Sequence, residues 1–331
     1  MAVISGGPGA EHEVSLRSGQ AITDALLERG VSVTRCIVAR DGTWRTGSTL
    51  GLGHAVATLG RADVVIPALH GPWGEDGTLQ GFLATIGVPF VGSGVLASAT
   101  CMDKQRTKLV LAAARIPVAA GRVIDAPPTA ELARELVATL GLPLFVKPVV
   151  GGSSYGVSRV TTVAGLVPAV VNALGYCDSV LVEQELRGRE IDLGVLERVD
   201  GSLDISPSLE IVSDPLEPFF STRAKYASEQ TRFLVPAPVA DDLQLTLHDL
   251  AQRAFVALGC AGLARVDCIV DEIRGPVVNE VNTFPGFTER SQFPLVWGAA
   301  GLAFPDLVGA LIETALARSA PGSAERTARS A

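Results

Sequence analysis

The sequence predicts a mixed α/β and α+β fold divided into three units. Its 331 residues, 47% of them hydrophobic, are too many for one ordinary core and suit two or three smaller ones. Strand-like and helix-like segments alternate in the first third, which predicts a parallel sheet with helices on both faces. We place the units at residues 1–92, 93–186 and 187–318. A tail follows, 319–331, whose composition indicates disorder.

The first unit combines buried-type strands with amphipathic helices. The predicted strands are Ala2–Ile4, Val31–Ala39, Asp63–Leu69 and Pro89–Val91, and the predicted helices are Val14–Arg29 and Leu79–Ile86. Glycine-rich turns follow the first and third of these strands. Ligands of such sheets bind at the carboxyl ends of the strands, so both turns are candidate ligand loops.

The second unit places a glycine-rich loop between two strands. Its predicted helices are Ala97–Ala114 and Thr129–Leu140, and its predicted strands are Leu144–Pro148, Gly156–Val160 and Val180–Gln184. The third unit contains two strands, an irregular stretch at 213–238, a helix, a hairpin and a closing helix. The regular segments are Glu190–Glu197, Leu209–Val212, Leu243–Leu258, Gly262–Val270 with Pro276–Val281, and Phe304–Ala317.

Charge and composition exclude several classes of protein. A net charge of −8 argues against binding to nucleic acid or to an acidic membrane face. The longest apolar runs, such as Val64–Leu69, are far shorter than a membrane span of roughly 20 residues. No basic leader precedes the first glycine turn, so we expect a cytoplasmic protein. Five cysteines without metal-ligand spacing suggest reduced thiols.

The loop Gly151–Gly156 follows Lys147 at the end of a buried-type strand. Glycine lets the backbone approach a phosphate closely, and a buried ammonium group requires an anion. The sequence matches neither the P-loop nor the dinucleotide-binding fingerprint. Phosphate binding and a simple glycine hairpin turn both remain open on this evidence.

Three oxygen-bearing side chains share the predicted hairpin. Asp267 lies on one strand, and Glu280 and Asn282 lie two residues apart on the other, so they face one side. Such oxygen donors suit Mg²⁺. A solvated strand face is the alternative, but the apolar neighbours favour partial burial and hence a cation.

Two further polar segments have common structural explanations. His70 begins a glycine-rich acidic loop, and a lone histidine is more often structural than catalytic. Glu11–Glu13 stands at a helix start, where acidic residues favour the helix dipole. Spacing alone therefore favours capping for Glu11–Glu13.

Taken together, these segments resemble the D-alanine–D-alanine ligases of the ATP-grasp superfamily. The order and spacing hold from about residue 4 to residue 300. The motifs that carry the resemblance are Gly6-Gly7 with Glu11-His12-Glu13-Val14-Ser15, Ala68-Leu69-His70-Gly71 with Gly74-Glu75-Asp76-Gly77-Thr78, Met102-Asp103-Lys104, Val146-Lys147-Pro148, Gly152-Ser153-Ser154, Lys225-Tyr226, Arg265-Val266-Asp267, Asn279-Glu280-Val281-Asn282-Thr283 and Pro285-Gly286-Phe287-Thr288.

The resemblance implies a three-domain ATP-grasp fold, in which an N-terminal Rossmann-like parallel sheet precedes two lobes that clasp ATP. It implies ligation of two D-alanines through a D-alanyl phosphate, with ATP and two Mg²⁺ (or Mn²⁺) ions, for peptidoglycan precursors. It also implies a homodimer, and a mobile loop at 213–238 that closes over the site and excludes water.

The resemblance also assigns roles to individual residues. The nucleotide is implied to contact Lys104, Lys147, Ser153, Glu183, Leu186, Glu190 and Lys225. The magnesium ligands are implied to be Asp267, Glu280 and Asn282. The oxyanion is implied to be stabilised by Arg265 and the Gly286 N–H. The substrates are implied to meet Glu11, His70, Ser291 and Gln292. A hydrogen-bonded triad that holds the mobile loop shut is implied for Glu11, Ser153 and Tyr226.

Two positions bear on the product. Tyr226 is typically absent from related ligases that form an ester, so its presence favours a dipeptide. Gln292 stands where the family usually has Leu or Met, which leaves open a polar second substrate such as D-serine, or an antibiotic-pathway paralogue. A nucleotide-binding regulator without chemistry is disfavoured by the intact Arg265 and Asp267. A dinucleotide-dependent oxidoreductase is disfavoured because no G-x-G-x-x-G follows the first strand.

Overall fold

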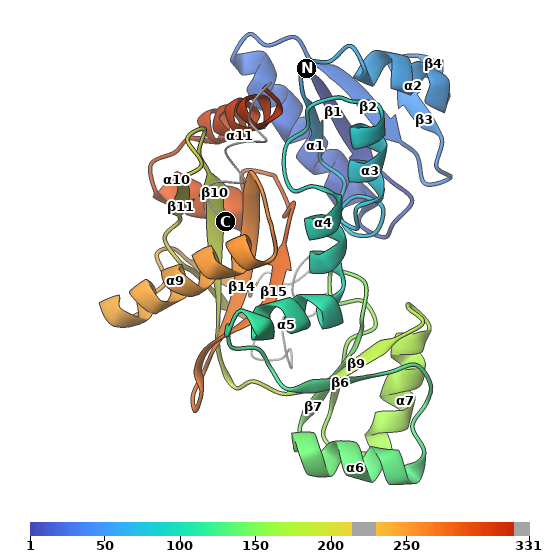
Figure 1. Ribbon diagram of the computed structural model, residues 1–331, viewed down its shortest axis with the longest axis vertical. Helices are drawn as coiled ribbons and strands as arrows, with labels where there is room; N and C mark the ends of the chain where they lie inside the picture. Colours follow the sequence, from blue (N-terminus) through green and yellow to red (C-terminus); the bar gives the residue numbers. More distant parts are fainter. Residues whose placement is uncertain (214–229, 321–331) are drawn as a thin grey trace.

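A computed structural model describes residues 1–213 and 230–320 (Figure 1). Lys225, Tyr226, most of the predicted mobile loop and nearly all of the predicted tail lie outside the described residues. Sheets of five, four and six strands organise the described chain, which confirms the mixed three-part fold. The boundaries at 92 and 186 stay predictions.

The N-terminal sheet has the strand order β4-β3-β2-β1-β5. Its strands are β1 Ala2–Gly6, β2 Thr34–Val38, β3 Trp44–Thr46, β4 Thr49–Leu50 and β5 Val65–Pro67. The first, second and fifth strands are parallel, but β3 and β4 form an antiparallel edge. The prediction of a parallel sheet was therefore wrong at that edge, where short turns allow antiparallel pairing. The predicted strand Pro89–Val91 is also wrong, because a single bridge at Phe90 replaces it.

Helices cover both faces of this sheet, as predicted. They are α1 His12–Glu28, α2 Leu52–Leu59 and α3 Thr78–Thr85. Val3 and Ile66 pack towards α1, whereas Ile4 and Val65 pack towards α2 and α3, because successive strand residues face opposite sides.

The predicted helix Ala97–Ala114 is wrong as a single helix. Asp103 adopts an extended conformation between α4 Val95–Met102 and α5 Lys104–Ala113. Its carboxylate caps the second helix by accepting the Arg106 N–H at 2.9 Å. The Lys104 N–H donates to the Val149 carbonyl at 3.0 Å, so a tertiary contact replaces the helical bond.

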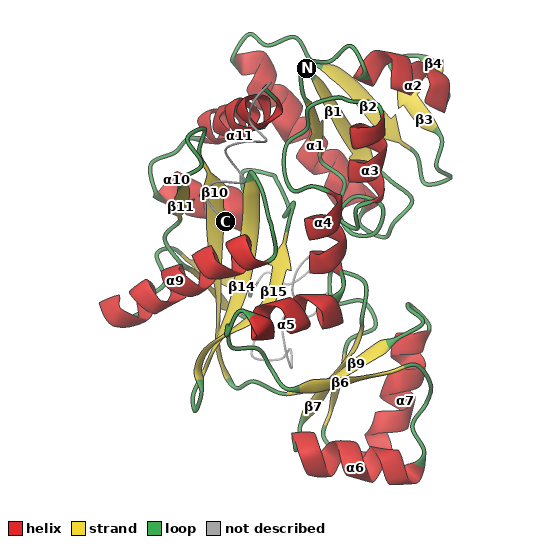
Figure 2. Cartoon of the chain, in the orientation of Figure 1, coloured by secondary structure: helices red, strands yellow, loops and turns green. Residues whose placement is uncertain are grey.

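The central sheet forms a separate lobe at the lower end of Figure 2. Its antiparallel strands follow the order β6-β9-β7-β8. The elements are β6 Gly121–Ile124, α6 Ala130–Leu140, β7 Leu144–Pro148, β8 Ser158–Val160, α7 Val163–Leu174 and β9 Val180–Gln184. Its core contains residues of this lobe alone.

The third sheet has the order β13-β12-β10-β14-β15, with β11 beside β10. Its strands are β10 Gly188–Glu197, β11 Leu203–Ile205, β12 Leu209–Val212, β13 Arg232–Leu234, β14 Leu263–Asp271 and β15 Gly275–Asn282. The helices are α9 Asp241–Ala257, α10 Gln292–Ala299 and α11 Phe304–Ser319. The predicted β14–β15 hairpin is confirmed. The stretch 213–238 is not wholly irregular, because it contains β13.

One hydrophobic core joins the first and third units. Leu26 of α1 and Ile66 of β5 share it with Phe287 and Leu311 of α11. α1 therefore packs against α11 (Figure 1). In the described residues, no single helix is long and apolar enough to span a membrane.

Candidate active site

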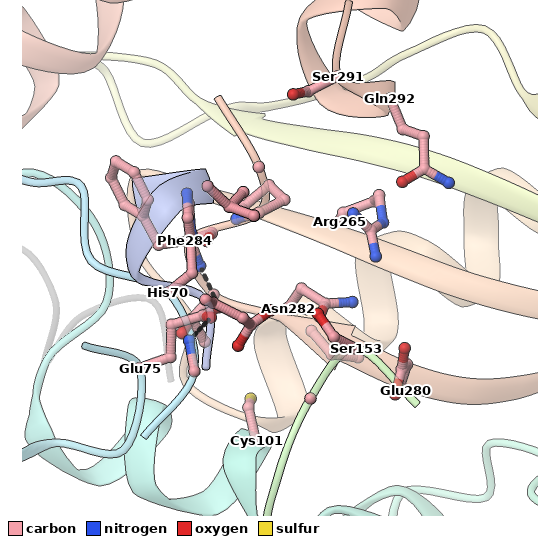
Figure 3. Close-up of a pocket in the computed structure, with 18 of the residues that line it drawn as sticks. His70, Glu75, Cys101, Ser153, Arg265, Glu280, Asn282, Phe284, Ser291 and Gln292 are labelled. Carbon is pink, nitrogen blue, oxygen red and sulfur yellow. Dashed lines mark hydrogen bonds between the residues drawn. The ribbon is translucent and has the colours of Figure 1, made fainter. Parts of the chain in front are cut away.

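Two adjoining cavities lie where residues of the three units meet. The first has a volume of about 290 Å³ and the second about 250 Å³. They share a set of lining residues drawn from all parts of the site: Lys104, Gly151, Gly152, Ser153, Arg265, Asn279, Glu280 and Gln292. Figure 3 shows several of these side chains pointing towards the common space.

Every predicted site residue that the structure describes lines one or both cavities. The first cavity is lined by Glu11, His70, Lys104, Ser153, Arg265, Glu280, Asn282, Gly286, Ser291 and Gln292. The second adds Lys147, Glu183, Leu186, Glu190 and Asp267. Residues up to about 280 positions apart in the sequence are thus brought together by the fold.

Glu183 of β9 is a buried carboxylate of the second cavity. Its oxygens form ion pairs with Lys147 of β7 and, at 2.9 Å, with Lys108 of α5. Burial alone would raise the pKa of Glu183, but the two ammonium groups outweigh it and lower the pKa to about 2. Lys108 was not predicted as a site residue. The scarcity of lysine in this sequence was a signal, but Lys108 lies in no recognised motif.

The glycine loop brings the central lobe to the first cavity. The Lys104 ammonium donates to the Gly151 carbonyl at 2.7 Å, and the Ser153 hydroxyl donates to the Glu11 carboxylate. Glu11 is the N-cap residue of α1 and Glu13 lies in its first turn, as the capping interpretation expects, but the Glu11 side chain makes no capping bond to the helix.

Two glycines make room for the Glu11 carboxylate. A Cβ atom at Gly71 would lie 2.2 Å from Glu11 Oε2, and one at Gly152 would lie 3.2 Å from it. Gly71 also has a φ of +69°, which side-chain-bearing residues rarely adopt. The carboxylate therefore lies between the N-terminal and central lobes, in a space that glycine alone leaves open.

The β14–β15 hairpin carries the charged floor of the site. Arg265 forms two bonds to Asp267, at 2.6 and 2.7 Å, and the Asn282 amide donates to Asp267 at 3.0 Å. A bulge opposite Asp267 shifts the register, so Asn279 and Glu280 both line the cavities. The sequence does not reveal this bulge, which is why Asn279 was not predicted as a site residue.

The hairpin residues fit a magnesium ion by their chemistry. Asp267 and Glu280 are cross-strand partners, and Asn282 faces the same side two residues on. A carboxylate has lone pairs beyond those that accept an arginine, so the Arg265 pair does not prevent Asp267 from binding a cation. In the described chain, no group of three or more His, Cys, Asp or Glu side chains forms a metal cluster. A magnesium site here would therefore need the side-chain oxygen of Asn282 as a ligand beside the two carboxylates.

The Gln292 amide is held by a buried carboxylate at the edge of both cavities. Its Nε2 donates to Asp192 of β10 at 2.7 Å, and Asp192 lies 3.4 Å from the Arg265 guanidinium. Because Asp192 is buried, its carboxylate competes well with any small ligand for this amide. Ser291 lies beside it and accepts the Thr288 N–H at 3.0 Å.

At the other end of the first cavity, the side chains of His70 and Glu75 form hydrogen bonds with backbone groups. Burial lowers the pKa of His70, so its ring is neutral at pH 7. Burial, together with the nearby Glu11 carboxylate, raises the pKa of Glu75 to about 8. Glu75 lies within one of the motifs that carry the family resemblance, but it was not predicted as a site residue.

Known protein families and relatives match this chain over almost its whole length. The family model described as D-ala D-ala ligase C-terminus matches residues 111–313, and the model described as D-ala D-ala ligase N-terminus matches residues 47–93. A D-alanine–D-alanine ligase of Corynebacterium aurimucosum is 42% identical over 352 aligned residues, covering 96% of this chain and 98% of that protein. One of Nocardia farcinica is 48% identical over 297 residues, covering 89% and 81%.

Solved structures of ligases are similar to this chain over nearly its whole length. The VanG D-Ala:D-Ser ligase of Enterococcus faecalis superposes with a TM-score of 0.84 at 31% identity, covering 95% of this chain and 98% of that one. The D-alanine–D-alanine ligase of Coxiella burnetii gives a TM-score of 0.83 at 30% identity, covering 99% and 96%. The chain belongs to the D-alanine–D-alanine ligase family.

Proposed function

We propose that this protein joins two D-alanine molecules into D-alanyl-D-alanine at the expense of ATP. The observation that carries the proposal is the pair of adjoining cavities, one lined by lysines and the other by Glu11, which meet at Arg265 and Glu280. A donor of phosphate and an acceptor carboxylate bound in these cavities would lie side by side. The full-length similarity to D-alanine–D-alanine ligases supports this assignment.

The second cavity is the proposed nucleotide site. Lys104 and Lys147 would neutralise the phosphates, with Lys225 contributing from outside the described residues. Glu183, Leu186 and Glu190 would hold the base and ribose. The ion pairs of Glu183 with Lys108 and Lys147 keep that carboxylate charged and fixed, so its oxygens are preorganised as acceptors.

Asp267, Glu280 and Asn282 would hold magnesium, which would supply positive charge beside the phosphates. The protein's own contribution is the Arg265 guanidinium, fixed by Asp267 and Asp192. This cation offsets the repulsion between a carboxylate and a triphosphate, which would otherwise oppose their approach.

The proposed reaction has two steps. A carboxylate oxygen of the first D-alanine attacks the γ-phosphorus, the bond to the β-phosphate oxygen breaks, and ADP leaves with that electron pair. The amine of the second D-alanine then attacks the acyl carbon and loses a proton, and phosphate leaves. Glu11 would bind the first ammonium group, Ser291 would bind the second carboxylate, and Arg265 with the Gly286 N–H would stabilise the oxyanion.

The higher identity to D-alanine–D-alanine ligases than to the D-Ala:D-Ser ligase supports D-alanine as the second substrate. Gln292 is compatible with this choice, because its amide donates to Asp192 and that contact uses one of its two N–H donors. We further propose that the product enters peptidoglycan precursor synthesis, that the enzyme acts in the cytoplasm where ATP is available, and that it is a homodimer.

The test is a product assay with ATP, Mg²⁺ and an equimolar mixture of D-alanine and D-serine. Mass spectrometry is expected to show D-alanyl-D-alanine as the main product, with ADP released in equal amount. Arg265→Met is expected to lower kcat at least 100-fold while a fluorescent ATP analogue still binds, because the proposed role of Arg265 is in the reacting complex. Absence of dipeptide from the wild-type protein would reject the proposal.

A further inference from the structure

The loop after β15 is held at both ends by side chains of the N-terminal unit. Phe284 is the second residue of this loop, and both of its backbone groups are hydrogen-bonded. Its N–H donates to Glu75 Oε1 at 3.3 Å, and its carbonyl accepts from His70 Nδ1 at 3.1 Å. Figure 3 shows His70 and Glu75 close to Phe284.

Phe287, three residues later, is held by a serine of α1. Its N–H donates to Ser18 Oγ at 3.1 Å, and the same oxygen lies 2.8 Å from His70 Nε2. Ser18 is fully buried and His70 is 6% exposed. The two ends of the loop are therefore connected through one serine and one histidine.

The proton positions along this series of hydrogen bonds follow from the atoms that can only accept. A carbonyl only accepts, so His70 Nδ1 carries the proton that is donated to Phe284. A neutral ring then leaves Nε2 as an acceptor, and the Ser18 hydroxyl must donate to it. The remaining lone pairs of Ser18 Oγ accept the Phe287 N–H. Each group has one role, and a change at any member disturbs the others.

Aromatic packing restrains the same two anchors. The rings of Phe284 and Phe287 lie 5.7 Å apart, and Phe287 also contacts Phe293 at 5.8 Å. Both anchors are buried, and Pro285 and Gly286 between them line the first cavity together with Phe284. The loop is thus fixed at its ends and presents its middle to the substrates.

We infer that Ser18, His70 and Glu75 are positioning residues that set the place of the Gly286 N–H. This inference rests on the proposed function, in which that N–H meets the oxyanion. The three residues do not touch the reacting atoms. Through these residues, the position of the N-terminal unit determines the position of the loop in the C-terminal unit. The N-terminal unit also carries Glu11. A donor displaced by about 1 Å loses on the order of 100-fold in rate.

Family resemblance implies that His70 meets the first substrate, and the histidine does line the first cavity. A hydrogen bond from its ring to that substrate would need a free ring nitrogen. Here Nδ1 and Nε2 are both committed to protein groups, one on each side of the ring. His70 therefore acts on the loop, and its effect on the substrates is indirect.

The decisive experiment compares two serines of the same helix. Ser15 lies one turn before Ser18, is equally buried, and also accepts one backbone N–H (Gly6, 2.7 Å) and donates once (Ala68 carbonyl, 2.6 Å). Ser18→Ala is expected to lower kcat for dipeptide formation at least 10-fold, with the KM for ATP within twofold of wild type. Ser15→Ala is expected to lose similar stability but to keep kcat within about twofold. Equal kcat values for the two variants would overturn the inference.

A second pair of variants decides the matter if Ser18→Ala does not fold. Asparagine places an amide N–H near the position of Nδ1, whereas glutamine places one near Nε2. His70→Asn is therefore expected to retain at least fivefold more kcat than His70→Gln, because it keeps the bond to the Phe284 carbonyl. Equal or reversed activities would overturn the inference. If the wild-type protein itself formed no dipeptide, the proposed function would fail first.

Discussion

Two groups of buried, oppositely charged side chains line the candidate site. Glu183 lies between two ammonium groups, and Arg265 lies between two carboxylates, Asp267 and Asp192. A buried charge without a partner is costly, so each group depends on all its members. The chain uses lysine at only four positions against a large excess of arginine. Lys108 and Lys147 occupy positions that suit lysine better than arginine, because two compact ammonium groups fit around one carboxylate.

Gln292 provides a residue-scale prediction about the second substrate. Asp192→Val removes the acceptor of the Gln292 amide and frees it to bind a substrate hydroxyl. We expect the ratio of kcat/KM for D-serine to that for D-alanine to rise about tenfold, which corresponds to about 1.4 kcal/mol, or one hydrogen bond. Both rates will fall because Asp192 also supports Arg265, but the ratio cancels that common loss. Competition assays with mass detection measure it.

Two controls separate this effect from general damage. Asp192→Asn keeps an acceptor oxygen for the Gln292 amide, so it should keep the wild-type ratio. The double variant Asp192→Val with Gln292→Leu lacks the amide altogether, and its ratio should equal that of Gln292→Leu alone. A double variant that prefers D-serine as strongly as Asp192→Val would show that the amide is not responsible.

At the scale of elements, local pattern predicted most segments and failed where tertiary contacts decide. The strands Leu144–Pro148, Val180–Gln184 and Leu209–Val212 have the predicted bounds, because continuous apolar runs bounded by turn residues are strong signals. The helix break at Asp103 was missed. It depends on a bond between Lys104 and Val149, which lie 45 positions apart and cannot be paired by local pattern.

The site was predictable to a similar degree. Motif resemblance located Glu11, Lys147 and Arg265, and the structure places them at the cavities. Lys108 and Ser18 were missed, since each acts through a neighbour rather than on a ligand. Such residues have no motif of their own, and only the folded arrangement reveals their partners.

The Asp103 cap gives an element-scale prediction. Asp103→Ala removes the acceptor of the Arg106 N–H at the start of α5, which costs about 1 kcal/mol of unfolding free energy. α5 also carries Lys104 and Lys108 into the proposed nucleotide site, so we expect the KM for ATP to rise about 3–10-fold, in line with about 1 kcal/mol of binding. Asp103→Asn keeps an acceptor and should behave nearly as wild type. If Asp103→Ala is destabilised but its KM for ATP is unchanged, the Asp103 cap does not contribute to nucleotide binding.

By their hydrophobic packing, the residues that the structure describes divide into two parts rather than three. The first and third units share one core through α1 and α11, whereas the central lobe has a core of its own. The proposed nucleotide site lies between these two parts, so motion of the central lobe would change it without disturbing the Gly286 loop. The loop's anchors, Ser18 and His70, lie in the same part as the loop itself.

This division predicts how local destabilisation spreads. Leu166 of α7 is fully buried in the central core, and Leu311 of α11 is buried in the shared core. Truncation of either to Ala costs about 2–5 kcal/mol. In hydrogen exchange with mass detection, Leu166→Ala should lower protection within residues 121–184 alone, whereas Leu311→Ala should lower it in α1 and β1 as well as in α11. Val171→Ala, at an exposed position of α7, should change neither region. Loss of protection throughout the chain in Leu166→Ala would mean that the central lobe does not open independently, because only separate cores allow a local cost to stay local.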